Sequence, residues 1–197
     1  GNLRDPATAV PFRPTTDVVA SGGVTDWRAR TVVRDSGAGN AQSIQGGQLG
    51  YVTSGANTTG HLDMWWDGDA NTTLNTGNAL LPDFTQGGAA YIHSTLGTAS
   101  SAPATVTFRA YYGGAGLYGE VTRTVPGASE LEFWIPYSEF GPLVTWGNLN
   151  AFEAILTSTA PSIQWVYLTG DVGLEGSSST PEPGTFALMG ILVALGG

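Results

Sequence analysis

The sequence predicts an all-β protein, an antiparallel two-sheet β-sandwich of jelly-roll-like type with an extended N-terminal arm and a short C-terminal apolar helix. Three observations predict it. Short runs of alternating apolar and polar residues recur along the chain, Gly, Asn, Asp and Ser separate these runs, and no amphipathic stretch of helical length precedes the C-terminal end. With 197 residues, of which 41% are apolar, the chain suits one core.

Nine runs carry the two-residue repeat of a half-buried strand. Their ranges are Trp27–Arg34, Gln48–Thr53, Gly60–Trp66, Gly88–Ser94, Ala104–Tyr112, Leu117–Val125, Glu130–Tyr137, Ala151–Ser158 and Ser162–Thr169. In the third run, the residues expected on the core face are Leu62, Met64 and Trp66. Those expected on the opposite face are His61, Asp63 and Trp65. Before the tail, the segment that comes nearest to a helical turn is 136–140, and Ser138 is a candidate cap for it.

Composition divides the chain into four parts. Residues 1–17 contain three prolines and little periodicity, which indicates an extended arm. Residues 18–174 hold the predicted strands and form the sandwich domain. Residues 175–180 are a Gly/Ser-rich linker. Residues 181–197 form a tail whose thirteen-residue apolar run, 185–197, is shorter than the roughly 20 residues that a membrane-spanning helix needs.

The tail begins with Pro181, Glu182 and Pro183, and a helix-competent apolar run follows them at the end of the chain. The larger apolar residues of the run are Phe186, Leu188, Met189, Ile191, Leu192, Val193 and Leu195. This arrangement resembles the PEP-CTERM sorting signal. The resemblance covers about the last 17 residues and implies export to the outer surface or extracellular matrix of a Gram-negative bacterium. It also implies membrane contact through the tail before processing by an exosortase-type protease.

Charge and cysteine content exclude several functions. The net charge is −9 and all seven basic residues are arginines without a cluster, so nucleic acid and anionic membranes are not expected partners. The chain has no cysteine, which excludes disulfides and thiolate chemistry. A secretory leader does not open the sequence, and we expect it to have been removed.

Two sets of residues have the composition of a metal site. Asp67, Asp69 and Asn71 have the alternate spacing of a calcium loop, but Thr72 and Asn78 stand where the EF-hand pattern needs glycine and glutamate. A strand-connecting turn is the better interpretation, and calcium binding stays open. His61 and His93 lack a paired ligand at zinc spacing, so no metal or other cofactor is predicted.

Catalysis is not predicted either. The chain has no Gly-x-Ser-x-Gly elbow beside its two histidines. A glycosidase needs two carboxyl groups facing one another. The candidate carboxylates show no such spacing; they are Glu130, Glu132, Glu139, Glu153 and Asp171. Glu130 and Glu132 have the pattern of solvated positions on one strand face.

The sequence therefore predicts a non-enzymatic exported structural or adhesive protein. It could self-associate, because the arm could add a strand to a neighbouring copy and the apolar tails could bundle. The alternative is a carbohydrate-binding module that retains exopolysaccharide at the cell surface. Trp65, expected to be exposed beside the core residue Trp66, is its first candidate for stacking on sugar, and Trp146 is the second.

Overall fold

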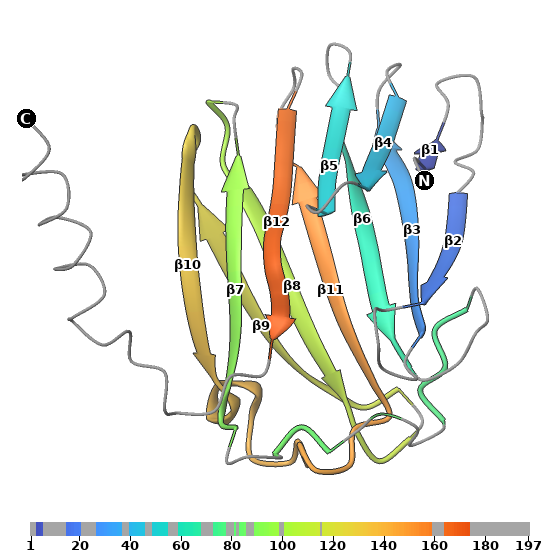
Figure 1. Cartoon of the computed structure of the whole chain (residues 1–197), viewed down its shortest axis with the longest axis vertical. Coiled ribbons are helices and arrows are strands. Elements are labelled where there is room, and N and C mark those ends of the chain that lie inside the picture. The colour runs from blue at the N-terminus through green and yellow to red at the C-terminus, as the bar shows by residue number, and fades with distance from the viewer. Residues whose placement is uncertain are drawn as a thin grey trace, which may run out of the picture.

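The computed structural model describes residues 3–5, 15–20, 27–36, 40–45, 49–54, 59–67, 73–77, 81, 83–85, 89–98, 101–114, 116–158 and 164–173. These residues form two six-stranded sheets in which every pairing is antiparallel (Figure 1). The predicted all-β, two-sheet sandwich is confirmed.

The first sheet has the strand order β1-β4-β5-β12-β7-β10. Its strands are β1 (Leu3–Asp5), β4 (Asn40–Gln45), β5 (Leu49–Ser54), β12 (Gln164–Gly173), β7 (Tyr91–Thr98) and β10 (Ser129–Pro136). The second sheet has the order β2-β3-β6-β11-β8-β9. Its strands are β2 (Thr15–Ala20), β3 (Trp27–Ser36), β6 (Thr59–Trp66), β11 (Ala151–Ser158), β8 (Ala104–Tyr111) and β9 (Tyr118–Val125).

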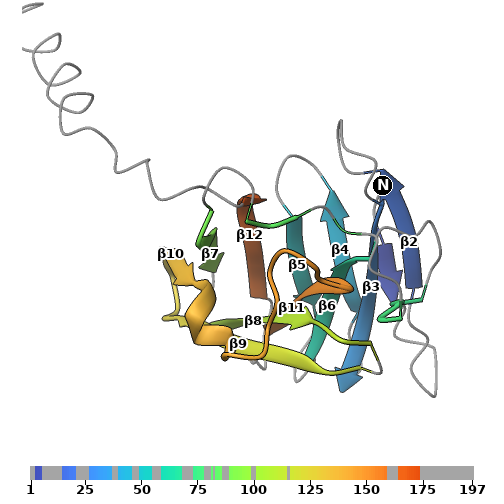
Figure 2. The same ribbon diagram turned by 90° about the horizontal axis from the view of Figure 1, so that it is seen from below.

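From β6 onward the chain passes repeatedly between the sheets. β6, β8, β9 and β11 lie in the second sheet, whereas β7, β10 and β12 lie in the first. Figure 2 shows β7 and β12 in one layer, with β8 and β9 in the other. This crossing is the jelly-roll-like connectivity that the sequence predicts.

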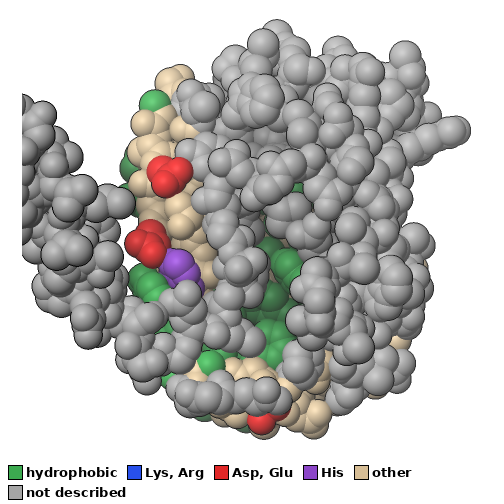
Figure 3. Space-filling model, viewed as in Figure 1, with side chains coloured by type: hydrophobic (Ala, Val, Ile, Leu, Met, Phe, Trp, Pro, Cys, Tyr) green, Lys and Arg blue, Asp and Glu red, His purple; other side chains and the backbone are tan. Residues whose placement is uncertain are grey.

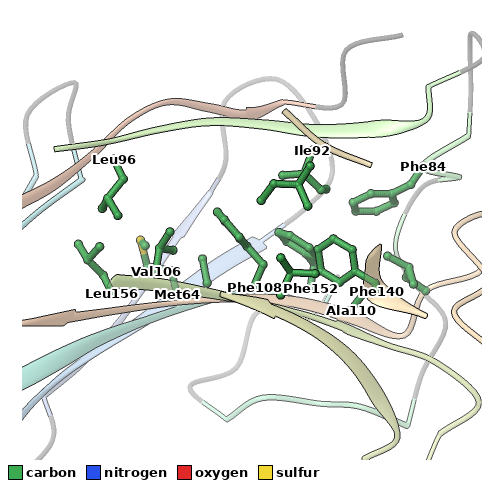
Figure 4. Close-up of a cluster of buried hydrophobic side chains, with 14 of the residues drawn as sticks. Met64, Phe84, Ile92, Leu96, Val106, Phe108, Ala110, Phe140, Phe152 and Leu156 are labelled. Carbon is green, nitrogen blue, oxygen red and sulfur yellow. The ribbon is translucent and has the colours of Figure 1, made fainter. Parts of the chain in front are cut away.

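The core lies between the sheets and is built from the inward half of each alternating strand. Figure 4 shows Ile92 and Leu96 reaching down from the first sheet toward Met64, Phe108 and Leu156 of the second. Each of these five side chains is fully buried, and burying such a side chain stabilises the fold by about 1.5–3 kcal/mol. Since the alternation that the sequence shows in β6 and β8 is also the observed burial pattern, hydrophobic periodicity fixes which face is the core.

Aromatic side chains close one end of the sandwich. A one-turn 3-10 helix, Tyr137–Phe140, turns Phe140 into the core, where it meets Trp146 edge-on. Tyr137 stacks on Trp146 with ring centroids 3.8 Å apart and donates its hydroxyl to the carbonyl of Phe84. The expected cap at Ser138 is wrong, because Pro136 occupies the N-cap position and no side chain caps this turn.

The N-terminal segment enters both sheets. β1 pairs with β4 and β2 pairs with β3, so the described strands of the predicted arm are hydrogen-bonded within the same chain. The boundaries at residues 17, 174 and 180 remain predictions. The linker, the tail and the expected C-terminal helix lie outside the described residues. Among the helices that are described, none has the length and apolar character needed to cross a membrane.

Candidate functional site

The outward side chains of four strands in the second sheet form the most elaborate polar arrangement of the described chain. We call this surface the polar face. Its members alternate with core residues on β6, β11, β8 and β9. They are His61, Asp63, Trp65, Glu153, Ile155, Thr157, Thr105, Thr107, Arg109, Tyr111, Tyr118, Glu120, Thr122 and Thr124.

Arg109 lies at the centre of the polar face and joins three strands. The strand register places it opposite Glu153 of β11 and opposite Glu120 of β9. Its Nε donates to Glu120 Oε2 at 2.7 Å, and its Nη1 donates to Glu153 Oε2 at 3.4 Å. The Tyr111 hydroxyl donates to the same Glu153 oxygen at 2.8 Å. One guanidinium therefore fixes two carboxylates on the sheet.

Tyr118 is an exposed ring that its neighbours hold in place. The guanidinium carbon of Arg109 lies 4.9 Å from the Tyr118 ring centroid, and the Tyr111 ring lies 5.3 Å away in a tilted arrangement. Contacts of both kinds contribute about 0.5–1.5 kcal/mol each. Tyr118 nevertheless stays 45% exposed. The polar face thus presents a rigid aromatic surface to solvent.

A glycine-rich hairpin loop sets this arrangement. Tyr111 and Tyr118 pair at the ends of β8 and β9, and Tyr112 donates its backbone N–H to the carbonyl of Leu117 to close the loop. Gly113 and Gly114 have φ values of 65° and 71°, in the left-handed region that residues with a Cβ rarely adopt. The turn fixes the register, and the register places Arg109 opposite Glu120.

Burial and hydrogen bonding determine the protonation states in this cluster. Burial raises the pKa of Glu153, an effect that the hydrogen bond from Tyr111 opposes and the negative charge of Asp63 reinforces. Burial also raises the pKa of Tyr111, and the hydrogen bond to Glu153 raises it further, so the phenol stays a donor at neutral pH. Burial, the largest single effect, lowers the pKa of Arg109, but the hydrogen bond to Glu120, the charge of Glu153 and the Tyr111 hydroxyl together raise it above its usual value, and the guanidinium stays charged.

Threonine hydroxyls cover the part of the polar face beside this cluster. The Thr107 and Thr122 hydroxyl oxygens lie 2.9 Å apart across β8 and β9, and Thr105 is in register with Thr124. A hydroxyl both donates and accepts hydrogen bonds, so these rows can contact polar ligands of either kind. They carry no charge and leave the electrostatics of the face to its ion pairs.

His61 forms the second charged cluster of the face. Its Nδ1 lies 2.8 Å from Asp35 Oδ1, and its Nε2 lies 3.5 Å from Asp63 Oδ2. The hydrogen bond to Asp35, followed by that to Asp63, raises the pKa of His61 to about 10, although burial opposes the shift. The imidazole is therefore a cation at neutral pH. The other Asp63 oxygen, Oδ1, is buried and has no hydrogen-bond partner in the described structure.

We predict that the stability of the fold decreases as the pH rises from about 6.5 to about 10. In this window the folded state keeps a proton on His61 that the unfolded state has lost, because the pKa of His61 is about 10 in the folded state and near 6.5 in the unfolded state. The stabilisation from protonated His61 is complete below the unfolded-state pKa and is lost as the pH rises through the folded-state pKa. Urea unfolding at several pH values measures this slope.

A His61→Gln variant is the control, since it removes the titrating group and should flatten this slope. The His61 ring protons, followed by NMR, should show no titration between pH 6 and 8. A midpoint near 6.5 for His61 in the folded protein would contradict the bridged geometry.

Trp65 lies on the predicted side of the sheet, but the prediction that it is exposed is wrong. The indole points away from Leu62 and Met64, yet it is only 5% exposed. β6 lies between β3 and β11, so neighbouring strands flank the ring on both sides, with Glu153 directly opposite. Trp66 packs against the core as expected.

The second tryptophan predicted for sugar stacking is also buried. Trp146 is 7% exposed and belongs to the aromatic cluster that closes the sandwich, where Phe84 donates its backbone N–H to the carbonyl of Trp146. Its ring has no face left for a ligand, because Tyr137 stacks on it and Phe140 meets it edge-on. Trp146 is part of the core.

The structure also places most of the other candidate residues. Asp67 is buried and accepts the backbone N–H of Asn75 at 2.8 Å, which is the bonding of a structured turn, while Asp69 and Asn71 lie outside the described residues. In the part of the chain that the structure describes, no three His, Cys, Asp or Glu side chains are placed to hold a metal ion. The sorting motif and the apolar tail lie outside that part.

The predicted carboxylates are spread over the molecule. Glu130 and Glu132 are exposed on β10, as expected, and Glu139 pairs with Arg123. Glu153 is the one that joins the polar face, whereas the side chain of Asp171 lies outside the described set. Sequence reasoning did not identify Arg109, Tyr118 and Glu120 as a cluster. The available signal in the sequence was the glycine-rich turn between the alternating strands β8 and β9, because this turn defines which residues of the two strands face one another.

No protein-family model matches this chain, and no curated protein matches it. Several solved structures do. The family 11 carbohydrate-binding module of the cellulosomal cellulase Lic26A-Cel5E of Clostridium thermocellum is 12% identical, with 86% of this chain and 83% of that chain covered and a TM-score of 0.35. The family 30 module of another cellulosomal cellulase of Clostridium thermocellum is 10% identical, with 79% of each chain covered and a TM-score of 0.34.

A third match is the module TmCBM61, solved in complex with β-1,4-galactotriose. It is 10% identical, with 81% of this chain and 85% of that chain covered and a TM-score of 0.32. Matches of this low identity and TM-score do not indicate what this chain binds. That question depends on the residues of the polar face.

Proposed function

We propose that this chain is a non-catalytic carbohydrate-binding protein that holds a neutral polysaccharide on its polar face. The observation that carries the proposal is Tyr118, a ring that stays 45% exposed while Arg109 and Tyr111 hold it in place. A fixed aromatic ring can stack on the apolar C–H face of a sugar without losing side-chain entropy on binding.

The groups around Tyr118 are suited to sugar hydroxyls. Glu120 supplies acceptor oxygens, and the threonine rows supply hydroxyls that both donate and accept. A site that combines one aromatic surface with several oriented polar groups has the usual composition of a small-ligand site.

The charge distribution favours a neutral ligand. The described cations of the polar face, Arg109 and His61, each lie between two carboxylates. An acidic sugar would have to compete with these carboxylates for the same cations. A neutral hexose polymer leaves both ion-pair networks intact.

The same pairing supports a non-catalytic role. Glycoside hydrolysis needs two carboxyl groups on opposite sides of the scissile bond. Glu120 and Glu153 instead bond to one guanidinium, and Glu153 is buried and also accepts from Tyr111. Such carboxylates hold the shape of the face.

The proposal also includes a cellular setting. With the Pro181-Glu182-Pro183 motif as its sorting signal, the chain would be exported and processed by an exosortase-type protease. The polar face would then retain exopolysaccharide at the outer surface or in the matrix. The structural matches are named as carbohydrate-binding modules, but the proposal depends on the residues of the face.

We predict that Tyr118→Ala weakens polysaccharide binding about tenfold, which corresponds to the loss of one aromatic contact of roughly 1.4 kcal/mol. Affinity electrophoresis in gels containing mixed-linkage β-1,3-1,4-glucan, β-1,4-galactan or galactomannan measures the effect. Tyr118→Phe keeps the ring and should retain most of the affinity.

Leu143→Ala is the matched control, because it removes an exposed apolar side chain, 69% accessible, from a loop outside the polar face. Its binding should equal that of the wild type. If none of the three neutral polysaccharides slows the wild-type protein, the carbohydrate proposal fails and a purely structural role replaces it.

A further inference from the structure

The outer surface of the first sheet carries a separate cluster at the β7–β10 edge. Figure 3 views the molecule from this side and shows acidic side chains and a histidine beside hydrophobic atoms, over the region of β7 and β10 in Figure 1. On β10 the outward residues include Glu130, Glu132 and Trp134, because Phe133 and Ile135 alternate with them and face the core.

The cluster consists of Trp134, His93 and Glu132, and we call it the indole platform. Trp134 is directly opposite His93 in the strand register, and the two rings stack with centroids 4.1 Å apart and an interplanar angle of 18°. Glu132 forms a hydrogen bond with His93 Nε2. The carboxylate fixes the imidazole, and the imidazole fixes the indole.

The stacking leaves one side of the indole accessible. Trp134 is 39% exposed although His93 covers one of its ring faces, so the exposed area belongs to the opposite face and the ring edge. β10 is the last strand of its sheet, which leaves Trp134 at the border of the molecule. A planar ligand group can reach this ring without rearrangement of the fold.

We propose that the indole platform is a second glycan-binding site, which stacks a neutral hexose ring on Trp134 and hydrogen-bonds its hydroxyls to Glu132. Chemistry favours a sugar over a protein partner. The cores of protein interfaces are depleted in charged residues, and here the exposed ring shares its strand face with Glu132 and Glu130, two and four residues away along the strand. An exposed ring bordered by carboxylates suits the amphipathic ring of a hexose.

The location of the indole platform suggests a function beyond the retention of polysaccharide, namely the cross-linking of polysaccharide chains. The platform lies on the outer surface of the first sheet, whereas the polar face lies on the outer surface of the second, with the core between them. Two separate glycans could therefore be bound at once. A protein with one site on each sheet cross-links polysaccharide chains when its two sites hold two different chains.

NMR of 15N-labelled protein tests the platform directly. The indole N–H signal of Trp134 is identified by its loss in Trp134→Phe. We expect it to shift on titration with a mixed-linkage β-1,3-1,4-glucan tetrasaccharide or β-1,4-galactotriose. Glu132→Gln should weaken the oligosaccharide affinity obtained from this titration about 3- to 10-fold, since it removes a charged acceptor but keeps the Trp134 ring that stacks on the sugar.

Cross-linking is measured as the rise in viscosity of a mixed-linkage β-glucan or β-1,4-galactan solution upon addition of protein. Trp134→Ala and Tyr118→Ala should each strongly reduce the rise, whereas the control Leu143→Ala should keep it. In affinity electrophoresis each of the two single variants should still bind, and the double variant should bind more weakly than either.

The outcomes separate this proposal from the previous one. If the signals of Tyr111 and Arg109 shift with both oligosaccharides tested while Trp134 stays unchanged, the platform is not a glycan site and the polar face is. If Trp134 shifts and the polar face does not, the platform stands and the polar face fails. A Trp134 shift that depends on protein concentration without sugar indicates contact between copies and overturns the platform.

Discussion

Phe152→Ala is expected to lower the free energy of unfolding by about 3–5 kcal/mol, the usual cost of deleting a buried phenylalanine ring. Phe152 is 1% exposed and lies on β11, at the point where the sandwich core meets the aromatic end. Its ring stacks on Phe108 at 6.0 Å and also contacts Phe84 at 6.1 Å. Removing it would leave a cavity lined by rings that cannot all move inward.

Urea unfolding followed by tryptophan fluorescence measures this loss, because Trp66 and Trp146 lie against Phe152 with centroids 6.0 and 6.4 Å away. Leu143→Ala serves again as the comparison and should change stability by less than about 0.5 kcal/mol. A loss below about 1.5 kcal/mol for Phe152→Ala would show that the aromatic end does not pack as one unit with the core.

Strand prediction from the sequence succeeded where one face of a strand is buried and the other is not. All nine predicted runs are strands, because a strand with one buried face must alternate apolar and polar residues. The β7 prediction ended four residues early, at Ser94 instead of Thr98. Gly97 is paired on both sides within the sheet, but in the sequence a glycine resembles a turn.

Three strands were missed for a different reason. β4 has the sequence Asn-Ala-Gln-Ser-Ile-Gln, with little apolar contrast between its two faces. β1 and β2 lie on either side of a proline-bearing segment that indicates an arm. All three are strands because neighbouring strands supply hydrogen bonds, and tertiary pairing of this kind outweighs weak local preference.

The candidate site shows the same limit at the level of side chains. Alternation correctly placed Trp65 opposite the core, but exposure depends on what lies beside a strand, and β6 is an interior strand. The partner of His61 was equally hidden, because Asp35 lies where the register between β3 and β6 shifts. A single sequence shows which face a residue takes and gives little information on its neighbours across the sheet.

The polar face and the core meet at the first residues of β9. Tyr118 faces outward as the proposed sugar platform, and the next residue, Gly119, is buried. A Cβ added to Gly119 would lie 2.0 Å from the carbonyl oxygen of Phe140 and 2.6 Å from Val144 Cγ2. The chain needs glycine here because the aromatic end of the sandwich packs directly against the β9 backbone.

Gly119→Ala is therefore expected to destabilise the fold by about 3 kcal/mol, at the upper end of the usual cost of overpacking, since the obstructing oxygen belongs to the backbone. Relief of the clash must move β9 away from the 3-10 helix, and this movement carries Tyr118 away from Arg109 and Tyr111. Binding of mixed-linkage β-glucan should weaken as well, even under conditions in which the variant is fully folded.

Gly77→Ala makes the same chemical change where the added methyl meets only ordinary van der Waals contact, with Asn75 Oδ1 at 3.5 Å, and it should leave stability and binding unchanged. Urea unfolding and affinity electrophoresis of the two variants separate the effects. If Gly119→Ala loses stability but binds the glucan as tightly as Gly77→Ala, the position of Tyr118 does not control the site. Sugar recognition would then have to depend on the threonine rows instead.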